Sequence, residues 1–109
     1  MTPARLITFA VNELVIDAEA VAEAILRACR RGSAACVQGV IQLRSEFIVI
    51  LADAPQPPQD LRFHQIDNPS LPDLESAMES RWIGGYDTLG MITDDSPEAT
   101  RCFILVQKR

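Results

Sequence analysis

The stretch FIVILA, residues 47–52, decides which fold this chain is expected to have. An uninterrupted apolar run rich in β-branched residues predicts a strand, yet a strand with one wet face alternates between apolar and polar side chains. FIVILA does not alternate, and neither does LITFAV at residues 6–11 or CFILV at residues 102–106. We therefore expect both faces of the sheet that these strands form to be covered.

Two helices are expected between the strands. Residues 17–32, DAEAVAEAILRACRRG, carry acids near the start and arginines near the end, so we expect Asp17 to cap this helix and Gly32 to end it. Residues 70–84, SLPDLESAMESRWIG, open with an S-x-x-D capping box at Ser70 and close with a pair of glycines. Capping signals thus define both ends of each helix.

Two hairpins supply the other strands. Residues 34–53 indicate two antiparallel strands around a three-residue RSE loop, and residues 86–107 two more around DDSPEA. The order β-α-β-β-α-β, with an additional C-terminal hairpin strand, predicts an α+β, ferredoxin-like two-layer sandwich: an antiparallel sheet with two helices on one face. We expect a single domain over residues 1–109 and a long proline-rich loop at residues 53–69 with one short extended piece. No internal repeat is expected.

Composition limits the classes of function. Ten basic residues face fifteen acidic ones among 109, and the net charge of −5 argues against nucleic acid as a partner. The first residues lack the pattern of a signal peptide, and no run approaches the roughly 20 apolar residues that cross a bilayer, so we expect no membrane contact. Three cysteines without CxxC spacing indicate reduced thiols and a cytoplasmic location.

The apolar strands also predict a partner. In a two-layer sandwich the helices cover one face of the sheet, and an exposed apolar patch on the other face marks an interface. No spare segment of the chain is long enough to cover that face, unless the proline-rich loop folds back over it. We therefore expect a homo-oligomer formed through the far face of the sheet, with loop cover or a foreign partner as the alternatives.

One residue of the second helix does not fit its surroundings. Arg81 falls within the apolar stripe of this helix, where a guanidinium must be paired, extend to solvent or face a cleft. One interpretation is that Arg81 reaches past the end of the helix, helped by the C-terminal dipole. The other is a ligand-binding site in which Arg81, Trp82 and Tyr86 surround an anion, while Gly84 and Gly85 let the backbone approach it.

Arg62 and His64 are the remaining candidates for a ligand-binding site. His64 is the single histidine, and as a general base it would need an orienting acid such as Asp67 and a nucleophile that the sequence does not identify. We therefore predict no catalytic residue. One histidine and scattered carboxylates give no metal-ligand spacing, and we expect no metal and no cofactor.

Two fragments resemble parts of known families. RRGSAACVQGV, residues 30–40, is similar to the helix-to-strand junction of the divalent-cation tolerance proteins, which are ferredoxin-like trimers. TLGMIT, residues 88–93, is similar to the opening strand of bacterial microcompartment shell proteins. The fold that these resemblances imply agrees with the ferredoxin-like fold expected from the element order, and we carry no functional residue over from either.

The leading hypothesis is a small, self-associating ferredoxin-like protein that binds a small ligand or a protein regulator. It rests on the strands that are apolar on both faces and on the position of Arg81 within the apolar stripe of the second helix. A second hypothesis is an enzyme of the dimeric α+β barrel kind, with a cleft around His64, Arg62 or Tyr86. A third is an acidic protein-interaction or inhibitor module, suggested by the net charge alone. Whether the chain is an enzyme stays open, with binding favoured.

Overall fold

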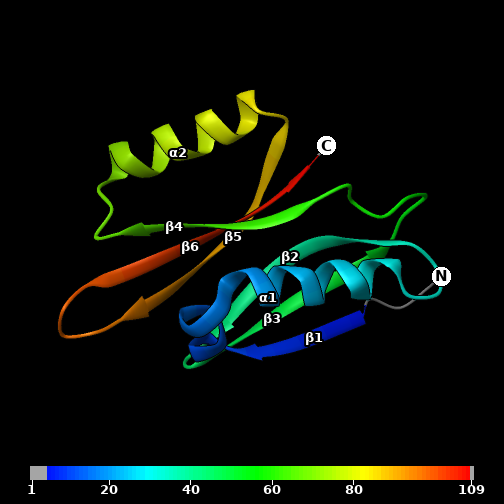
Figure 1. Ribbon diagram of the computed structural model, residues 1–109, viewed down its shortest axis with the longest axis horizontal. Coiled ribbons are helices and arrows are strands. Elements are labelled where there is room, and N and C mark those ends of the chain that lie inside the picture. The colour runs from blue at the N-terminus through cyan, green and yellow to red at the C-terminus, as the bar shows by residue number, and fades with distance from the viewer. Residues whose placement is uncertain (1–4, 109) are drawn as a thin grey trace.

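Two three-stranded antiparallel sheets and two helices form residues 5–108, the part of the chain that this computed structural model describes (Figure 1). Sheet A has the strand order β1-β3-β2, and sheet B has the order β4-β6-β5. Along the chain the elements are β1 (Arg5–Ala10), α1 (Val11–Arg30), β2 (Ala35–Leu43), β3 (Glu46–Asp53), β4 (Leu61–Asp67), α2 (Leu71–Ile83), β5 (Tyr86–Asp95) and β6 (Thr100–Lys108).

The α+β class and the antiparallel pairing agree with the prediction, but the ferredoxin-like topology is not confirmed. The chain forms six strands in two sheets, rather than one sheet with both helices on one face. The difference arises within the proline-rich segment 53–69, where residues 61–67 form β4 and pair with β6. The prolines flank LRFHQID and do not interrupt it, so its N–H groups are available for pairing. The C-terminal hairpin strand that was expected in addition is β6.

The two halves of the chain share one topology. A strand, a helix and a hairpin follow one another in β1-α1-β2-β3 and again in β4-α2-β5-β6, and the first strand of each half pairs with the last. The hairpin register shifts at the same place in both halves, next to Gly39 in β2 and next to Gly90 in β5. The structure thus repeats a β-α-β-β unit, although the sequence shows no internal repeat. The sequence conceals the repeat because VQGVIQ and TLGMIT, the segments around the two glycines, share only Gly and Ile.

The capping signals act as predicted. Asp17 leaves the helical region, with φ −158°, and divides α1 into a short first arm and a main helix. Its Oδ1 accepts a hydrogen bond from the N–H of Ala20 at 3.1 Å, as a helix cap does. Gly32 follows α1 with φ +67°, a conformation that glycine adopts without strain. At the start of α2, the side chains of Ser70 and Asp73 accept from each other's N–H groups at 3.3 and 3.0 Å.

The first hairpin turns more tightly than predicted. Leu43 pairs with Glu46, so the connection consists of Arg44 and Ser45 rather than of three residues. Arg44 adopts φ +58°, in the left-handed region that costs a residue with a side chain about 1–2 kcal/mol. The hydrogen bonds between β2 and β3 therefore hold Arg44 in a backbone conformation that a residue with a side chain disfavours.

Helix α1 lies between the two sheets. Its side chains Ile25 and Cys29 have no exposed surface. The core around them takes in one face of each sheet, namely Phe47, Val49 and Leu51 from sheet A and Ile92, Phe103 and Leu105 from sheet B. The two sheets thus share a single hydrophobic core with α1 at its centre.

Helix α2 covers the other face of sheet B. Successive side chains of a strand point to opposite faces, so the residues of β6 that alternate with Phe103 and Leu105 turn away from α1 and pack against Leu74 and Ala77 of α2; they are Cys102, Ile104 and Val106. α1 thus packs on one face of sheet A and on one face of sheet B, and α2 packs on the opposite face of sheet B. Figure 1 shows α2 above sheet B and α1 in front of sheet A. CFILV is buried on both faces, as predicted, because a different helix covers each face.

Sheet A is covered on one face only. Its outer face, the face away from α1, carries five large apolar side chains that share it by register: Leu6, Ile41, Leu43, Ile48 and Ile50. Leu6 is 64% exposed, Leu43 is 56% exposed and Ile41 is 47% exposed. All five lie outside both core clusters of the described residues. FIVILA was expected to be covered on both faces. It is covered on the face toward α1, and its outer face is not covered by the described residues.

The sheets meet where β2 lies beside β5. The side-chain amide of Gln42 donates to the carbonyl oxygen of Thr93 at 2.7 Å and accepts from its N–H at 2.9 Å, as a neighbouring strand would. Gly90 lies so close to Val40 that a Cβ at Gly90 would be 3.2 Å from the Cβ of Val40. At the corresponding position of sheet A, Gly39 has no atom within 4 Å of the place its Cβ would take.

We predict that Gly90→Ala lowers the free energy of unfolding by about 1–3 kcal/mol, the usual cost of adding a methyl group to a packed contact. Gly39→Ala is the matched control and should change stability by less than about 0.5 kcal/mol. Urea unfolding of both variants in dilute solution, followed by circular dichroism, measures the difference. Equal stability of the two variants would contradict the close packing of β2 against β5.

Candidate functional site

A cleft of about 490 Å³ lies between α1 and the free edge of sheet B. Three segments that are distant in the sequence line it: Glu19, Ala22, Glu23 and Leu26 from α1, residues 60–63 at the start of β4, and Arg81 from α2. β4 is an edge strand of sheet B. The cleft is therefore bounded by a helix on one side and by the outermost strand on the other.

Alternation along β4 separates the apolar residues of the cleft from the charged ones. Phe63 packs into the core around α1, whereas Arg62 and His64 project to the other face of sheet B, the face that carries α2. Arg81 follows Ala77 by four residues, so it lies on the same side of α2 and meets His64. The strand period and the helix period together bring these basic side chains to one edge of the sheet.

Asp60 is the negative centre of the site. Its Oδ2 accepts hydrogen bonds from the Nε of Arg62 at 2.6 Å and from the hydroxyl of Tyr86 at 2.7 Å. Burial alone would raise the pKa of Asp60, but the hydrogen bonds from Tyr86 and Arg62 outweigh it and hold that pKa below its usual value. The hydrogen bond to Asp60 also raises the pKa of Tyr86. At neutral pH the pair therefore consists of a carboxylate and a protonated phenol.

Two cations lie against the ring of Tyr86. The guanidinium carbon of Arg62 is 6.0 Å from the ring centroid, and the Nζ of Lys108 is 5.1 Å from it. Lys108 also donates to the carbonyl oxygen of Gly84 at 3.0 Å, which ties the end of α2 to β6. Contacts of this kind contribute about 0.5–1 kcal/mol each at exposed sites. Tyr86 therefore has cations at its ring and the Asp60 carboxylate at its hydroxyl.

Arg81 is paired with a histidine and not with a carboxylate. Its Nη2 donates to the Nδ1 of His64, so His64 is the neutral tautomer that carries its proton on Nε2. Burial and the charge of Arg81 both lower the pKa of His64, in agreement with a neutral ring. Within residues 5–108, no carboxylate forms an ion pair with Arg81. The half-buried guanidinium at the cleft therefore has no carboxylate in direct contact with it among the described residues.

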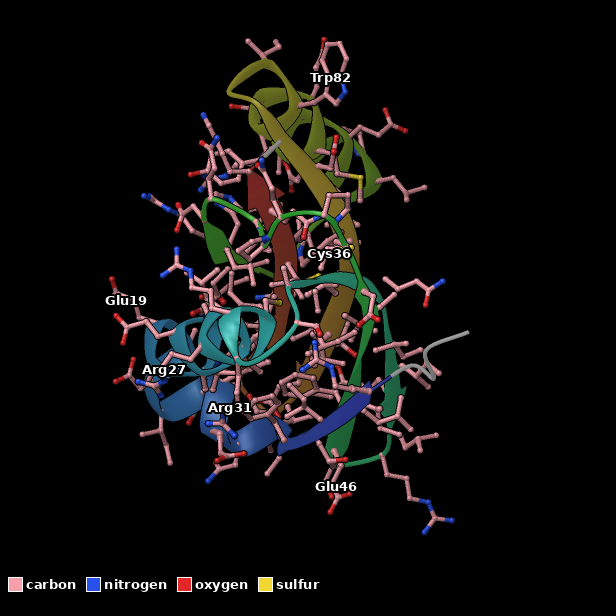
Figure 2. The ribbon with its side chains drawn as sticks, turned by 90° about the vertical axis from the view of Figure 1, so that its right-hand side faces the viewer. Glu19, Arg27, Arg31, Cys36, Glu46 and Trp82 are labelled. Carbon is pink, nitrogen blue, oxygen red and sulfur yellow. The ribbon has the colours of Figure 1, made fainter. Side chains whose placement is uncertain are left out.

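The structure brings together four of the five predicted ligand-binding residues, namely Arg62, His64, Arg81 and Tyr86. α2 continues to Ile83, so Arg81 does not reach past the end of the helix. Trp82 lies apart from the group. Its side chain is 62% exposed and lies at the outer end of α2, far from Glu19 on α1 (Figure 2). One residue along a helix rotates the side chain by about 100°, which turns Trp82 away from the cleft that Arg81 lines.

Sequence reasoning missed four residues of the site: Asp60, Lys108, Glu19 and Glu23. Asp60 stood in the segment that was expected to be a loop. Once residues 61–67 form a strand, its position two residues before Arg62 places both side chains on one face. The spacing of Glu19 and Glu23 does predict a shared face of α1. It gives no sign that β4, more than thirty residues away in the sequence, lies opposite.

Metal binding, thiol chemistry and membrane crossing each need a recognisable group of residues. Within residues 5–108, no group of three or more histidine, cysteine or acidic side chains is placed to hold a metal ion. The three cysteines are free thiols, and burial raises the pKa of Cys29 and of Cys102, which makes them weak nucleophiles. No helix in this part of the chain is both long and apolar enough to cross a membrane.

Known proteins provide no template for the cleft. The chain matches no family model, no curated protein and no solved structure. The interpretation of the site therefore depends on its own geometry, charges and hydrogen bonds.

We predict that acid destabilises the chain through His64. Because the folded pKa lies below the ordinary value of 6.5, the unfolded chain binds a proton more readily, and the free energy of unfolding falls as the pH drops below that value. His64→Gln keeps an acceptor for Arg81 and removes the titration. His64 is the single histidine, so thermal unfolding between about pH 5 and pH 7 should depend less on pH in the variant. An unchanged slope would assign the effect to other groups.

Proposed function

We propose that this chain is a small self-associating protein that binds a small ligand through an anionic group in the cleft between α1 and β4. The observation that carries the proposal is the guanidinium of Arg81, which lines the cleft and donates to the neutral ring of His64. A partly buried cation gains most from a charged partner when the surroundings exclude water. A carboxylate or a phosphate oxygen of the ligand is the partner that residues 5–108 do not supply to Arg81.

The charges around Arg81 support an anion. Arg62, Arg81 and Lys108 contribute three positive charges at this edge of sheet B, whereas Asp60 contributes one negative charge that Arg62 and Tyr86 already share. This edge of sheet B is therefore positive, although the whole chain carries −5, whereas the α1 wall of the cleft carries the acids Glu19 and Glu23. A field divided in this way attracts the anionic group of a ligand to the Arg81 side of the cleft.

The opposite wall of the cleft limits which anion fits. Glu19 and Glu23 of α1 line the same cleft. The hydrogen bond to Asp60 is the main cause that raises the pKa of Arg62, and the charge of Glu19 adds a smaller contribution. Two carboxylates repel a densely charged polyanion and attract an amine. The arrangement favours a zwitterion, a ligand with its anionic group toward Arg81 and a cationic group toward α1.

The geometry favours binding over catalysis at His64. A general base needs a free nitrogen within reach of the substrate, but the Nδ1 of His64 accepts from Arg81 and His64 does not line the cleft. The enzyme alternative therefore has less support than ligand binding. An interaction module without a pocket has less support as well, because the cleft is present.

Self-association and location complete the proposal. The outer face of sheet A exposes adjacent apolar side chains, and an apolar patch of this kind marks an interface in most soluble proteins. We propose that it binds a second copy of the chain. The three free thiols are typical of a reducing compartment, and we propose a cytoplasmic location.

Arg81→Gln tests the anion site, and Arg31→Gln, which removes the same charge from an exposed position outside the cleft, is the matched control. The probes are acetate, inorganic phosphate and γ-aminobutyrate, and the readout is thermal unfolding. A ligand at about ten times its Kd adds about 1.4 kcal/mol of stability, which raises the Tm of a chain of this size by several degrees. We expect γ-aminobutyrate to give this rise in the wild type and in Arg31→Gln, and to give none in Arg81→Gln.

Two results would contradict the proposal. One is the absence of a shift with all three probes in the wild type. The other is a shift that is as large in Arg81→Gln as in Arg31→Gln, because the ligand would then bind without the guanidinium. A larger shift with phosphate than with γ-aminobutyrate would keep the anion site and overturn the role of Glu19 and Glu23.

A further inference from the structure

We infer that α2 of a second copy covers the outer face of sheet A, so that chains associate head to tail and repeat the packing that α1 makes within one chain. The inference rests on the self-association proposed above and adds which surface of the partner is used. It follows from the repeated β-α-β-β unit. Within the chain, the sheet of the second unit packs on the helix of the first. Nothing among residues 5–108 makes the equivalent contact on the first sheet.

The strand registers show that the outer face of sheet A is the counterpart of a buried face. Gly39 and Gly90 mark the same position of the two hairpins, and each lies opposite a residue of the central strand, Ile50 or Leu105. Counting outward from these pairs matches four apolar residues of the outer face with residues that pack around α1: Leu6 with Phe63, Ile41 with Ile92, Ile48 with Phe103, and Ile50 with Leu105. Four positions that are core in sheet B are thus apolar but uncovered in sheet A.

The helices differ in the complementary way. α1 contacts both sheets, whereas α2 packs on sheet B alone and has no fully buried side chain. The two helices can be aligned at their C-cap residues, Arg31 for α1 and Gly84 for α2. This alignment matches three apolar residues of α2 with buried or partly buried residues of α1: Leu71 with Ala18, Met78 with Ile25, and Trp82 with Cys29. Ile25 and Cys29 are 0% exposed, whereas Leu71 is 73% and Trp82 is 62% exposed. The α2 flank, defined as Leu71, Met78 and Trp82, is the surface that a further sheet would cover.

The glycines give a third, independent sign. Gly90 admits Val40 of the other unit at 3.2 Å from the place of its Cβ, while the space beside its counterpart Gly39 is open in the described chain. The residue that corresponds to Val40 is Met91 of β5. Repeating the contact between units would therefore place Met91 of the next copy against Gly39.

A head-to-tail contact covers both apolar surfaces with one interface. Face-to-face packing of two copies of sheet A would cover the outer face and leave the α2 flank exposed. A contact between two different surfaces is heterologous, and its repetition gives a ring if the rotation closes and an open filament if it does not. We therefore expect masses above that of a dimer at high protein concentration.

The test uses the full chain and two variants at exposed positions, Ile41→Glu on the outer face of sheet A and Trp82→Glu on the α2 flank. Light scattering on a size-exclusion column gives the mass over a hundredfold range of concentration, and circular dichroism checks the fold. We expect the wild type to associate and each variant alone to be monomeric. An equimolar mixture of the variants should form a dimer that does not grow further, because one intact outer face then meets one intact α2 flank.

Gly39→Ala adds a variant with a smaller change. Since its Cβ would meet open space within the chain, the variant should unfold like the wild type at low concentration. In the association experiment it should need at least a tenfold higher concentration to assemble.

The outcomes separate this inference from the proposed function. If Trp82→Glu alone still forms dimers while Ile41→Glu does not, the outer face pairs with itself and the head-to-tail contact is overturned, although self-association stands. A wild type that stays monomeric at every concentration overturns both. The response of the cleft to γ-aminobutyrate is measured on the monomer. Its result is therefore independent of both association outcomes.

Discussion

Ile25 and Cys29 of α1 pack between two sheets that also meet along one edge, where β2 lies beside β5. A three-stranded sheet under one helix has a small core, and each half of this chain alone would expose a large apolar area. By packing on both sheets, α1 makes one core from two such halves. The edge contact between β2 and β5, which includes Gln42 and Gly90, then fixes the orientation of one sheet relative to the other.

The same packing creates the cleft. Because α1 lies under the inner face of sheet B, the helix runs beside the edge strand β4. Its solvent-facing acids, Glu19 and Glu23, then lie across from Arg62 and Arg81. The charged walls of the cleft therefore follow from the packing of α1 in the hydrophobic core. The contact of Arg81 with His64, in contrast, uses polar groups that hydrophobic packing does not require, and groups of that kind are where binding sites are found.

Local signals in the sequence predicted local structure well. The caps at Asp17 and Ser70 and the helix end at Gly32 depend on a few neighbouring residues, and each is found in the structure. The non-alternating strands correctly required cover on two faces for CFILV. They could not show that two different helices cover these faces. An apolar face indicates that something packs on it, but it does not identify the element that packs there.

The fold topology and part of the site depend on contacts that the sequence does not display. The prolines around β4 indicate a loop, and only a short extended piece was expected within it. The pairing of that piece with β6, the second sheet and the position of Asp60 were therefore not predicted. Arg81 was recognised because a charge in an apolar stripe is a local contradiction. Its partner His64 lies seventeen residues away on another element, and only the folded chain shows that the two meet.

The order of the strands along the chain has a consequence for synthesis. β6 is the central strand of sheet B, yet it follows every other strand of the core in the sequence. While the chain leaves the ribosome, β1 to β3 can fold with α1 on one side. The other side of α1 stays in contact with water or a chaperone until Phe103 and Leu105 emerge. Sheet formation in the second half waits for the same residues, so folding is governed by distant contacts and is expected to be slow.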